Sequence, residues 1–412
     1  MTNSSSAAAR GQISERELVV LLALLQALQA LAIDAMLPAL GVMAHDLGVS
    51  DPNRRQLVVA VFLIGIGFGS LLPGMLADRF GRRPVLFGCM AFYILPVLAC
   101  ALVQDFTTLL VLRAVQAVGS AGLAVIPAAI IRDRFEGDRM ARLQSLVSVI
   151  FLGVPMVAPT LGQGILLAFG WRWIFGCMAL LAMAVSAWAW LRLPETLNPE
   201  HRQPIRLRTI AANMYEVVTT RESIGYVLAG AMTIASIWSF INSAQQLIAE
   251  SFGAGEAFPL LFGAMAMGIA LANFVNARIV VRFGARRISH VGLFAFIMMA
   301  LLQVWLAHYP HQTLWQFAPV TFLNMALNGF LGANFTAIAL QPFARKAGAA
   351  ASVQAFLRTV TASIIGTTVG QAYDGTARPL AYMMLAAGCL SLLLVLFSER
   401  GKLFRRFDSP ET

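Results

Sequence analysis

The chain has 412 residues, of which 58% are hydrophobic and 12% are charged, and its mean hydropathy is +0.74. A soluble domain usually carries about a quarter charged residues, so a soluble fold is excluded. The net charge of +10 would suit a nucleic-acid binder, but no basic patch interleaved with aromatic residues is present, which excludes that class.

The apolar residues form blocks of about 20, the length that a helix needs to cross ~30 Å of hydrocarbon. The first block is too long for a signal peptide and lacks a small-residue cleavage site, so we expect it in the mature protein. Charge-poor windows predict an all-α membrane protein with twelve transmembrane helices at 18–44, 56–77, 84–104, 107–131, 143–169, 173–192, 224–248, 257–280, 288–307, 314–340, 349–373 and 379–398.

Lysine and arginine are distributed unevenly between the two sides of this layout. With a cytoplasmic N-terminus, the termini and even-numbered loops hold 24 of them and the outer loops hold four. Because positively charged loops stay on the cytoplasmic side, both termini are predicted to be cytoplasmic. We expect a multi-pass protein of a bacterial-type inner (plasma) membrane.

The chain is predicted to consist of two pseudo-symmetric six-helix bundles, residues 1–193 and 223–412, joined by a cytoplasmic linker at 194–222. The linker is the longest polar stretch and carries two prolines. The Phe-Gly pair in the loop after the second span recurs 203 residues later, after the eighth span. A spacing of about half the chain is typical of duplicated halves around a central site.

The loop after the second span reads Gly-Met-Leu-Ala-Asp-Arg-Phe-Gly-Arg-Arg-Pro-Val over residues 74–85. Glycine permits tight turns and close helix approach, and an acid among arginines can form a charge latch at a helix end. The alternative is a plain turn with positive-inside arginines. We predict a conformational latch made of Gly74, Asp78, Arg79, Gly81, Arg82 and Arg83. In the second copy Ala277 and Val281 replace the first glycine and the acid, so we expect that half to lack the latch.

Two further runs contain unusual residues for a span. Arg113 in the fourth span is followed by Gln116, and an arginine near mid-span costs about 2.5–3.5 kcal/mol, so it should face a cavity or a partner rather than snorkel outward. The fifth span has prolines four residues apart among small residues, which kink a helix and let it pack tightly, whether for function or for ordinary packing. The residues of this run that we single out are Gly153, Pro155, Ala158, Pro159 and Gly162.

These runs resemble known motifs. Loop 74–85 is similar, nearly position for position, to the loop signature of the major facilitator superfamily, and the run around Arg113 resembles that superfamily's second motif, with Ala117 in place of a common glycine. The fifth-span run resembles the motif of the drug:proton antiporter branch, with Ala158 and Gln163 in place of glycines. Residues 33–40, 195–204 and 276–278 resemble the Bcr/CflA group of multidrug exporters. The resemblance implies a proton-coupled antiporter that exports drugs or other small amphipathic compounds by alternating access.

An antiporter needs a group that binds and releases a proton. Asp34 is the only carboxylate well inside a predicted span, and no histidine lies mid-span. By helix rise, Asp34 lies roughly 15 Å from the outer end of its span and Arg113 roughly 9 Å from the outer end of its own. We predict that Asp34 and Arg113 form the proton-coupling pair; the alternative is that Asp34 only stabilises a kink before Pro38.

Polar and aromatic residues within the spans are candidates for a substrate cavity, although many such residues only join helices by hydrogen bonds. Arg358 in the eleventh span has no acid on its own helix, and Asp78, an anionic group of the substrate and backbone carbonyls are all possible partners. The predicted cavity residues are Gln26, Gln29, Gln116, Trp238, Asn242, Gln245, Asn324 and Asn328.

The sequence lacks the motifs of an enzyme, a metal site or an ATP-driven transporter. No nucleophile and base pair, metal-ligand spacing or Walker sequence is visible, so we expect no enzyme activity, metal or cofactor. The expected partners are a drug-like small molecule, protons and the lipid bilayer, with no nucleic acid, and the chain is expected to act as a monomer. A proton-coupled uptake symporter or a metabolite exporter of the same fold stays open, because a fold does not specify direction or substrate.

Overall fold

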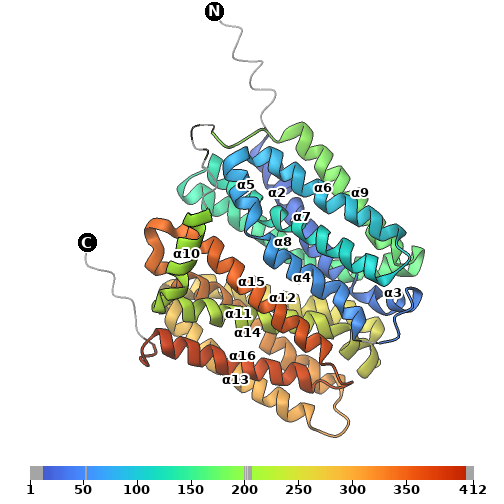
Figure 1. Cartoon of the computed structure of the whole chain (residues 1–412). Coiled ribbons are helices and arrows are strands. Elements are labelled where there is room, and N and C mark those ends of the chain that lie inside the picture. The colour runs from blue at the N-terminus through green and yellow to red at the C-terminus, as the bar shows by residue number, and fades with distance from the viewer. Residues whose placement is uncertain (1–12, 52, 199, 201, 203–206, 405–412) are drawn as a thin grey trace, which may run out of the picture. The chain divides into compact units, whose positions relative to one another are not determined.

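The computed structural model describes residues 13–51, 53–198, 200, 202 and 207–404. Every regular element in these ranges is a helix, as predicted (Figure 1). Ten helices are long and apolar enough to cross a membrane, and α4 (Leu57–Gly69) with α5 (Leu72–Phe80), bent by 43°, makes an eleventh span in the described part. The remaining predicted span coincides with α15 (Ala347–Gln371), which carries an arginine, two glutamines and several threonines.

The chain divides into two compact units, Met1–Ala39 with Phe68–Ile205 and Leu40–Gly67 with Arg206–Thr412. Residues 40–67 therefore belong to the unit that holds the C-terminal helices, although they precede the middle of the sequence. The predicted division into 1–193, 194–222 and 223–412 stays a prediction.

The first unit is built around α2 (Glu15–Asp34), which packs on α7, α8 and α9 and is the most enclosed of its long helices. Ser14 caps the start of α2, and Asp105 caps α7 by accepting from the Thr108 N–H at 2.8 Å. Gly119 lets α7 touch the backbone of α6, since a Cβ there would lie 2.5 Å from the Cys89 carbonyl oxygen. The other helices of this unit are η1 (Leu37–Ala39), α5, α6 (Arg82–Leu102), α7 (Phe106–Arg134), α8 (Gly137–Phe169) and α9 (Arg172–Arg192).

In the second unit α11 (Arg221–Gln245) has the central place, packing on α14, α15 and α16, and it continues into the π-helical η4 (Gln246–Ser251). Figure 1 shows α13 and α16 side by side at one face of this unit. Apart from α4 and α15, its other helices are α3 (Leu40–Asp46), η2 (Arg54–Gln56), α10 (Leu207–Thr219), η5 (Gly255–Ala257), α12 (Phe258–Phe283), α13 (Ala285–Ala307), α14 (Leu314–Leu340), η6 (Gln341–Lys346) and α16 (Arg378–Ser398).

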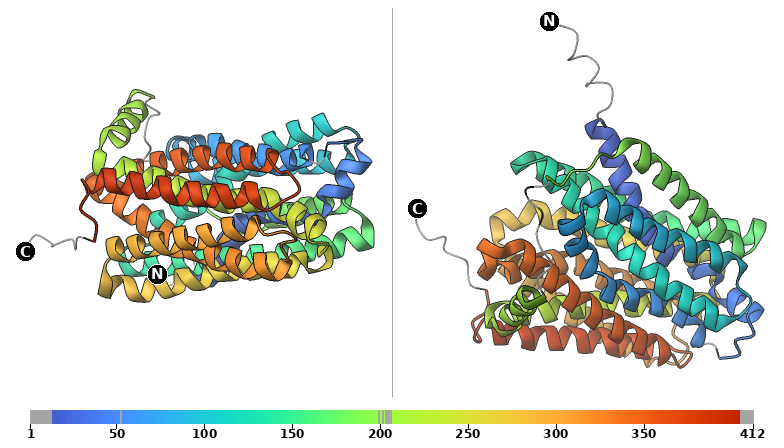
Figure 2. Two further views of the ribbon diagram at one scale, coloured as in Figure 1. Left: turned by 90° about the horizontal axis from the view of Figure 1, so that it is seen from below. Right: turned by 45° about the horizontal axis from the view of Figure 1, so that its top comes forward.

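Part of the predicted linker is helical. α10 occupies residues 207–219 and packs on α15 and α11. Figure 2 shows α10 projecting at a steep angle to the long helices of its unit. With 13 residues it is too short to cross a membrane, and it is not among the candidate spans.

Candidate functional site

Asp34 is the last residue of α2, where the chain leaves the α-helix for the turn that precedes Pro38. Its side chain is 4% exposed, and it forms no hydrogen bond or ion pair with any residue that the structure describes. A buried carboxyl group without a partner is costly in its charged form. The role of Asp34 as a proton carrier stays a prediction.

Arg113 on α7 is fully buried in the same unit. It donates to Gln116 Oε1 at 2.7 Å and to the Ala32 carbonyl oxygen at 2.8 Å. The predicted ion pair with Asp34 is not formed in this structure, but Ala32 brings the guanidinium to within two residues of Asp34 along α2. The role of the two residues in proton coupling stays a prediction.

The predicted antiporter-type helix is α8, with Pro155 and Pro159 inside it. Ala158 is fully buried, and a Cβ on Gly162 would overlap the Ala35 carbonyl oxygen, while Gly153 faces open space. Gly162 thus allows α8 to touch the chain directly after Asp34. A larger side chain at 162 would push the two helices apart.

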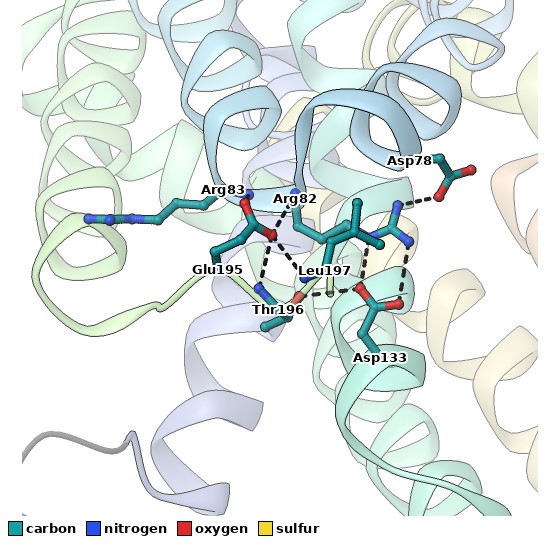
Figure 3. Close-up of polar contacts among 7 residues, drawn as sticks. All are labelled: Asp78, Arg82, Arg83, Asp133, Glu195, Thr196 and Leu197. Atoms are coloured by element: carbon teal, nitrogen blue, oxygen red, sulfur yellow. Dashed lines mark hydrogen bonds and ion pairs between the residues drawn. The ribbon is translucent and has the colours of Figure 1, made fainter. Parts of the chain in front are cut away.

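Two of the predicted latch residues, Asp78 and Arg82, belong to a charge network where α5 turns into α6 (Figure 3). Arg82 is 4% exposed and contacts two acids: its Nη1 lies 2.5 Å from Asp78, and its Nε lies 2.7 Å from Asp133 at the end of α7. Gly81 has φ +106°, a conformation that side chains rarely adopt, and so forms the turn between α5 and α6. Gly74 lies against Val125 of α7.

Glu195, beyond the end of α9, also contacts this loop, which the sequence did not predict. Its carboxylate accepts from the backbone N–H groups of Arg82 at 2.9 Å and Arg83 at 3.1 Å, at the start of α6. Figure 3 shows it to the left of Arg82, next to Thr196 and Leu197. A carboxylate at a helix N-terminus is favoured by the helix dipole and satisfies free N–H groups. The start of the linker is thereby fastened to the latch loop.

Arg79 is exposed and lies over the Phe80 ring at 5.5 Å, outside this charge network. Arg83 donates instead to the Trp190 carbonyl oxygen at 2.7 Å and lies 5.0 Å from the Trp190 ring centre. The predicted latch set therefore contains one residue, Arg82, that connects acids from two helices.

The predicted cavity residues are mostly engaged in joining helices. Gln26 and Gln29 donate to carbonyl oxygens of α7, at 3.3 Å to Ala124 and 3.5 Å to Ser120. In the second unit Asn328 accepts from Ser236 at 3.3 Å, which joins α14 to α11. Three amide oxygens of this set, those of Asn242, Gln245 and Asn324, are buried without a partner and are free to accept a hydrogen bond. Trp238 is half-buried on α11, and Gln245 donates to Glu250 at 3.3 Å.

Residues 53–55 form polar contacts within the second unit that the sequence did not predict. Arg55, 8% exposed, forms an ion pair with Glu250 at 2.6 Å. Asn53 donates to the carbonyl oxygens of Gln371 at 3.0 Å and Tyr373 at 2.9 Å. These contacts tie residues 53–55, from the N-terminal half of the sequence, to the ends of α11 and α15. No local pattern signals partners that lie about 195 and 320 residues apart.

Comparisons with known proteins identify the family. Residues 22–367 match the sequence profile described as Major Facilitator Superfamily. The chain belongs to this superfamily. This transporter is 27% identical over 380 residues to the "Bicyclomycin resistance protein homolog" of Haemophilus influenzae, covering 92% of this chain and 95% of the relative. It is 28% identical over 366 residues to the "Chloramphenicol resistance protein" of Pseudomonas aeruginosa, covering 85% and 83%.

The fold of this Major Facilitator chain is also similar to a solved structure. The crystal structure of the human organic anion transporter MFSD10 aligns with a TM-score of 0.68 and 18% identity, covering 94% of this chain and all of that one. At this identity the likeness shows the fold alone. The predicted family and fold class are thus confirmed, and the chain is a multi-pass membrane transporter.

Proposed function

We propose that this transporter is a proton-coupled antiporter that exports drugs or other small amphipathic compounds from the cytoplasm by alternating access. The observation that carries the proposal is the partnerless, buried carboxyl of Asp34 beside the helix carbonyl to which Arg113 donates. A carboxyl group favours its protonated form when buried away from cations and its charged form when a cation and water reach it. The names of the bicyclomycin and chloramphenicol resistance relatives support a drug as the cargo.

The contact between Gly162 and the backbone after Asp34 supports a role for α8 in coupling. A tilt of α8 would move the environment of Asp34 directly, because no side chain separates the two helices. The charge network of Arg82, Asp78 and Asp133 supports the role of the loop after α5 as a conformational latch. We further infer that the chain lies in a bacterial-type inner membrane and acts as a monomer.

The decisive experiment compares the wild type with Asp34→Asn in an efflux-deficient bacterium and in inverted membrane vesicles. Chloramphenicol and bicyclomycin, within a broader drug panel, serve as probes, and drug-dependent proton flux is measured. We expect flux in the wild type and none in Asp34→Asn. Glu256→Gln is the matched control, because Glu256 is exposed in η5 and makes no contact among the residues described.

The outcomes separate the claims. Absence of drug-dependent proton flux from the wild type across the panel contradicts the antiporter. Full coupling in Asp34→Asn leaves the antiporter standing and removes Asp34 as the carrier. Proton and compound moving in the same direction identifies an uptake symporter instead.

Orientation is tested separately. We infer that both termini are cytoplasmic, since the loops on that side hold the excess of arginine and lysine. A C-terminal alkaline phosphatase fusion is expected to be inactive, because that enzyme folds only outside the cytoplasm. An active fusion would show that the C-terminus lies outside the cytoplasm and would contradict the inferred orientation.

A further inference from the structure

The side chain of Arg358 lies near the middle of α15. Residue 358 is 11 residues after the start of the helix at 347 and 13 before its end at 371. At 1.5 Å per residue these positions are roughly 16 and 20 Å from the two ends of the helix. Two-repeat transporters bind their substrates near this depth, so a cation here lies at the level where cargo is held.

Arg358 is poorly satisfied by its own protein. Its Nη1 donates to the hydroxyl of Thr336 on α14, and its buried Nε has no hydrogen-bond partner. No carboxylate forms an ion pair with it in the described part of the chain. A guanidinium offers five N–H donors, so much of the capacity of Arg358 is unused.

Other buried arginines of the molecule are satisfied differently. Arg55 and Arg286 each pair with a glutamate at 2.6 Å, and Arg113 donates to two oxygens at 2.7 and 2.8 Å. The fold therefore supplies oxygen acceptors to each of these three arginines. Arg358, by contrast, has no carboxylate partner in the described part of the chain, and its Nε has no acceptor.

The surrounding sequence cannot provide a counter-charge either. Between Glu256 and Asp374 the chain contains no aspartate or glutamate, which leaves four successive long helices, α12 to α15, without an acid. Because intramembrane charges are paired or face a pathway, the balancing anion must come from outside these helices.

Two residues hold the guanidinium in place. The Thr336 hydroxyl donates to the Gly332 carbonyl oxygen at 2.7 Å and accepts from Arg358, so its orientation is set. Gly230 on α11 makes room for the arginine stem, since a Cβ there would lie 3.0 Å from Arg358 Cδ. One edge of the guanidinium is thus anchored on α14, and its buried Nε is left without an acceptor in the described part of the chain.

We propose that Arg358 binds a carboxylate group of the transported compound and makes the C-terminal helices an anion subsite. The planar fork of arginine matches a carboxylate with two parallel hydrogen bonds. The cargo class is then carboxylate-bearing amphipathic compounds, zwitterions included. This inference rests on the proposed export function, because it names a substrate class for that function.

The test uses purified full-length protein and three drug pairs, each a carboxylic acid and its methyl ester, with ciprofloxacin and its ester as the first pair. Binding is measured by ligand-dependent thermal stabilisation in detergent, and export is measured in proteoliposomes. We expect the wild type to bind the acids more tightly than the esters. Arg358→Gln should weaken acid binding by about tenfold or more and leave ester binding within about twofold, as for a lost charge-assisted hydrogen bond.

Three further variants test whether the effect is specific to the guanidinium group of Arg358. Arg278→Gln is the control, because Arg278 is exposed on α12 and lies over the Phe274 ring. Arg358→Lys keeps the charge without the fork and should retain part of the acid preference, which keeps the test valid if the glutamine variant does not fold. Gly230→Ala should shift the stem and weaken acid binding while leaving the charge in place.

Equal binding of acids and esters by the wild type, or an unchanged acid preference in Arg358→Gln, overturns the subsite. If the wild type exports neutral chloramphenicol with proton flux but shows no acid preference, only the subsite fails. If acids bind through Arg358 but no compound is exported, the export function fails and the subsite stands.

Discussion

The loops that follow the second span of each half have the same turn and different charge networks. Gly81 and Gly284 both have positive φ, +106° and +83°, with extended ψ. Arg79 lies 5.5 Å from the Phe80 ring centre, and Arg282 lies 5.3 Å from the Phe283 ring centre. The backbone turn and the exposed arginine have thus been kept in both copies.

The charged pair that crosses the turn in the first copy is absent in the second. Asp78 and Arg82 are replaced by Val281 and Ala285, and Val281 is 87% exposed. Arg286 pairs instead with Glu399 at 2.6 Å, and Glu399 also accepts from the Tyr226 hydroxyl at 2.8 Å. The predicted loss of the loop acid is visible, but this half ties its loop to an acid beyond its last helix.

An acid beyond the last helix is therefore the feature that both copies share. Glu195 follows α9 and Glu399 follows α16, and each contacts the start of the helix after the loop. The positive-φ turn and the contact with an acid that follows the last helix are therefore found at both loops. At the first loop the described residues place a buried arginine, Arg82, between two acids, Asp78 and Asp133.

The largest effect is expected from Arg82→Gln. Its removal leaves Asp133, 14% exposed, and Asp78 without their shared cation, and breaking a buried pair typically costs about 3–5 kcal/mol. Thermal and denaturant unfolding of the purified protein, together with transport, measures this cost. Arg79→Gln is the control with an exposed arginine on the same loop. Equal stability of the two variants would contradict the stabilising role of the ion pairs of Arg82.

A smaller loss is expected from Glu399→Gln. Arg286 loses the charge of Glu399, and glutamine still accepts from Tyr226, so the expected loss is about 1.5–3 kcal/mol. The same unfolding assay applies, with Glu222→Gln as control, because Glu222 is 58% exposed and lies 3.8 Å from Arg400. A loss as large as that of Arg82→Gln would show that the second network matters equally.

The smallest effect is expected from Val281→Asp. Position 281 is exposed and residue 285 is an alanine, so the new acid has no arginine four residues on, and stability should change by less than about 0.5 kcal/mol. Adding Ala285→Arg rebuilds the pair and should stabilise by about 0.3–0.5 kcal/mol relative to Val281→Asp alone. Differences in unfolding midpoint report both. A large gain from Val281→Asp alone would mean that another cation reaches this loop.

The spans were predictable because each depends on the apolar content of one continuous segment. α9 and α16 match the predicted 173–192 and 379–398 to within one residue. Irregular ends were not predictable: the first span breaks after Asp34 into a short turn and α3, and the second bends by 43°. Such breaks depend on contacts with other helices, which hydropathy does not report.

The candidate site was only partly predictable. The rarity of ionisable residues in the spans was enough to select Asp34, Arg113 and Arg358 as candidates. Their surroundings were not predictable, because Arg113 binds the Ala32 carbonyl rather than the Asp34 carboxylate. A depth calculated from helix rise places two residues at similar levels, but it does not say which way the side chains turn.

By itself the sequence determined that this is a helical membrane protein, because span length is a property of single segments. It also determined which few residues are charged inside the spans. Only the tertiary structure decided which acids hold Arg82, that Glu195 fastens the linker, and that no acid among the described residues pairs with Arg358. Those facts depend on distances between helices that lie far apart in the chain, and residue spacing along one helix does not encode them.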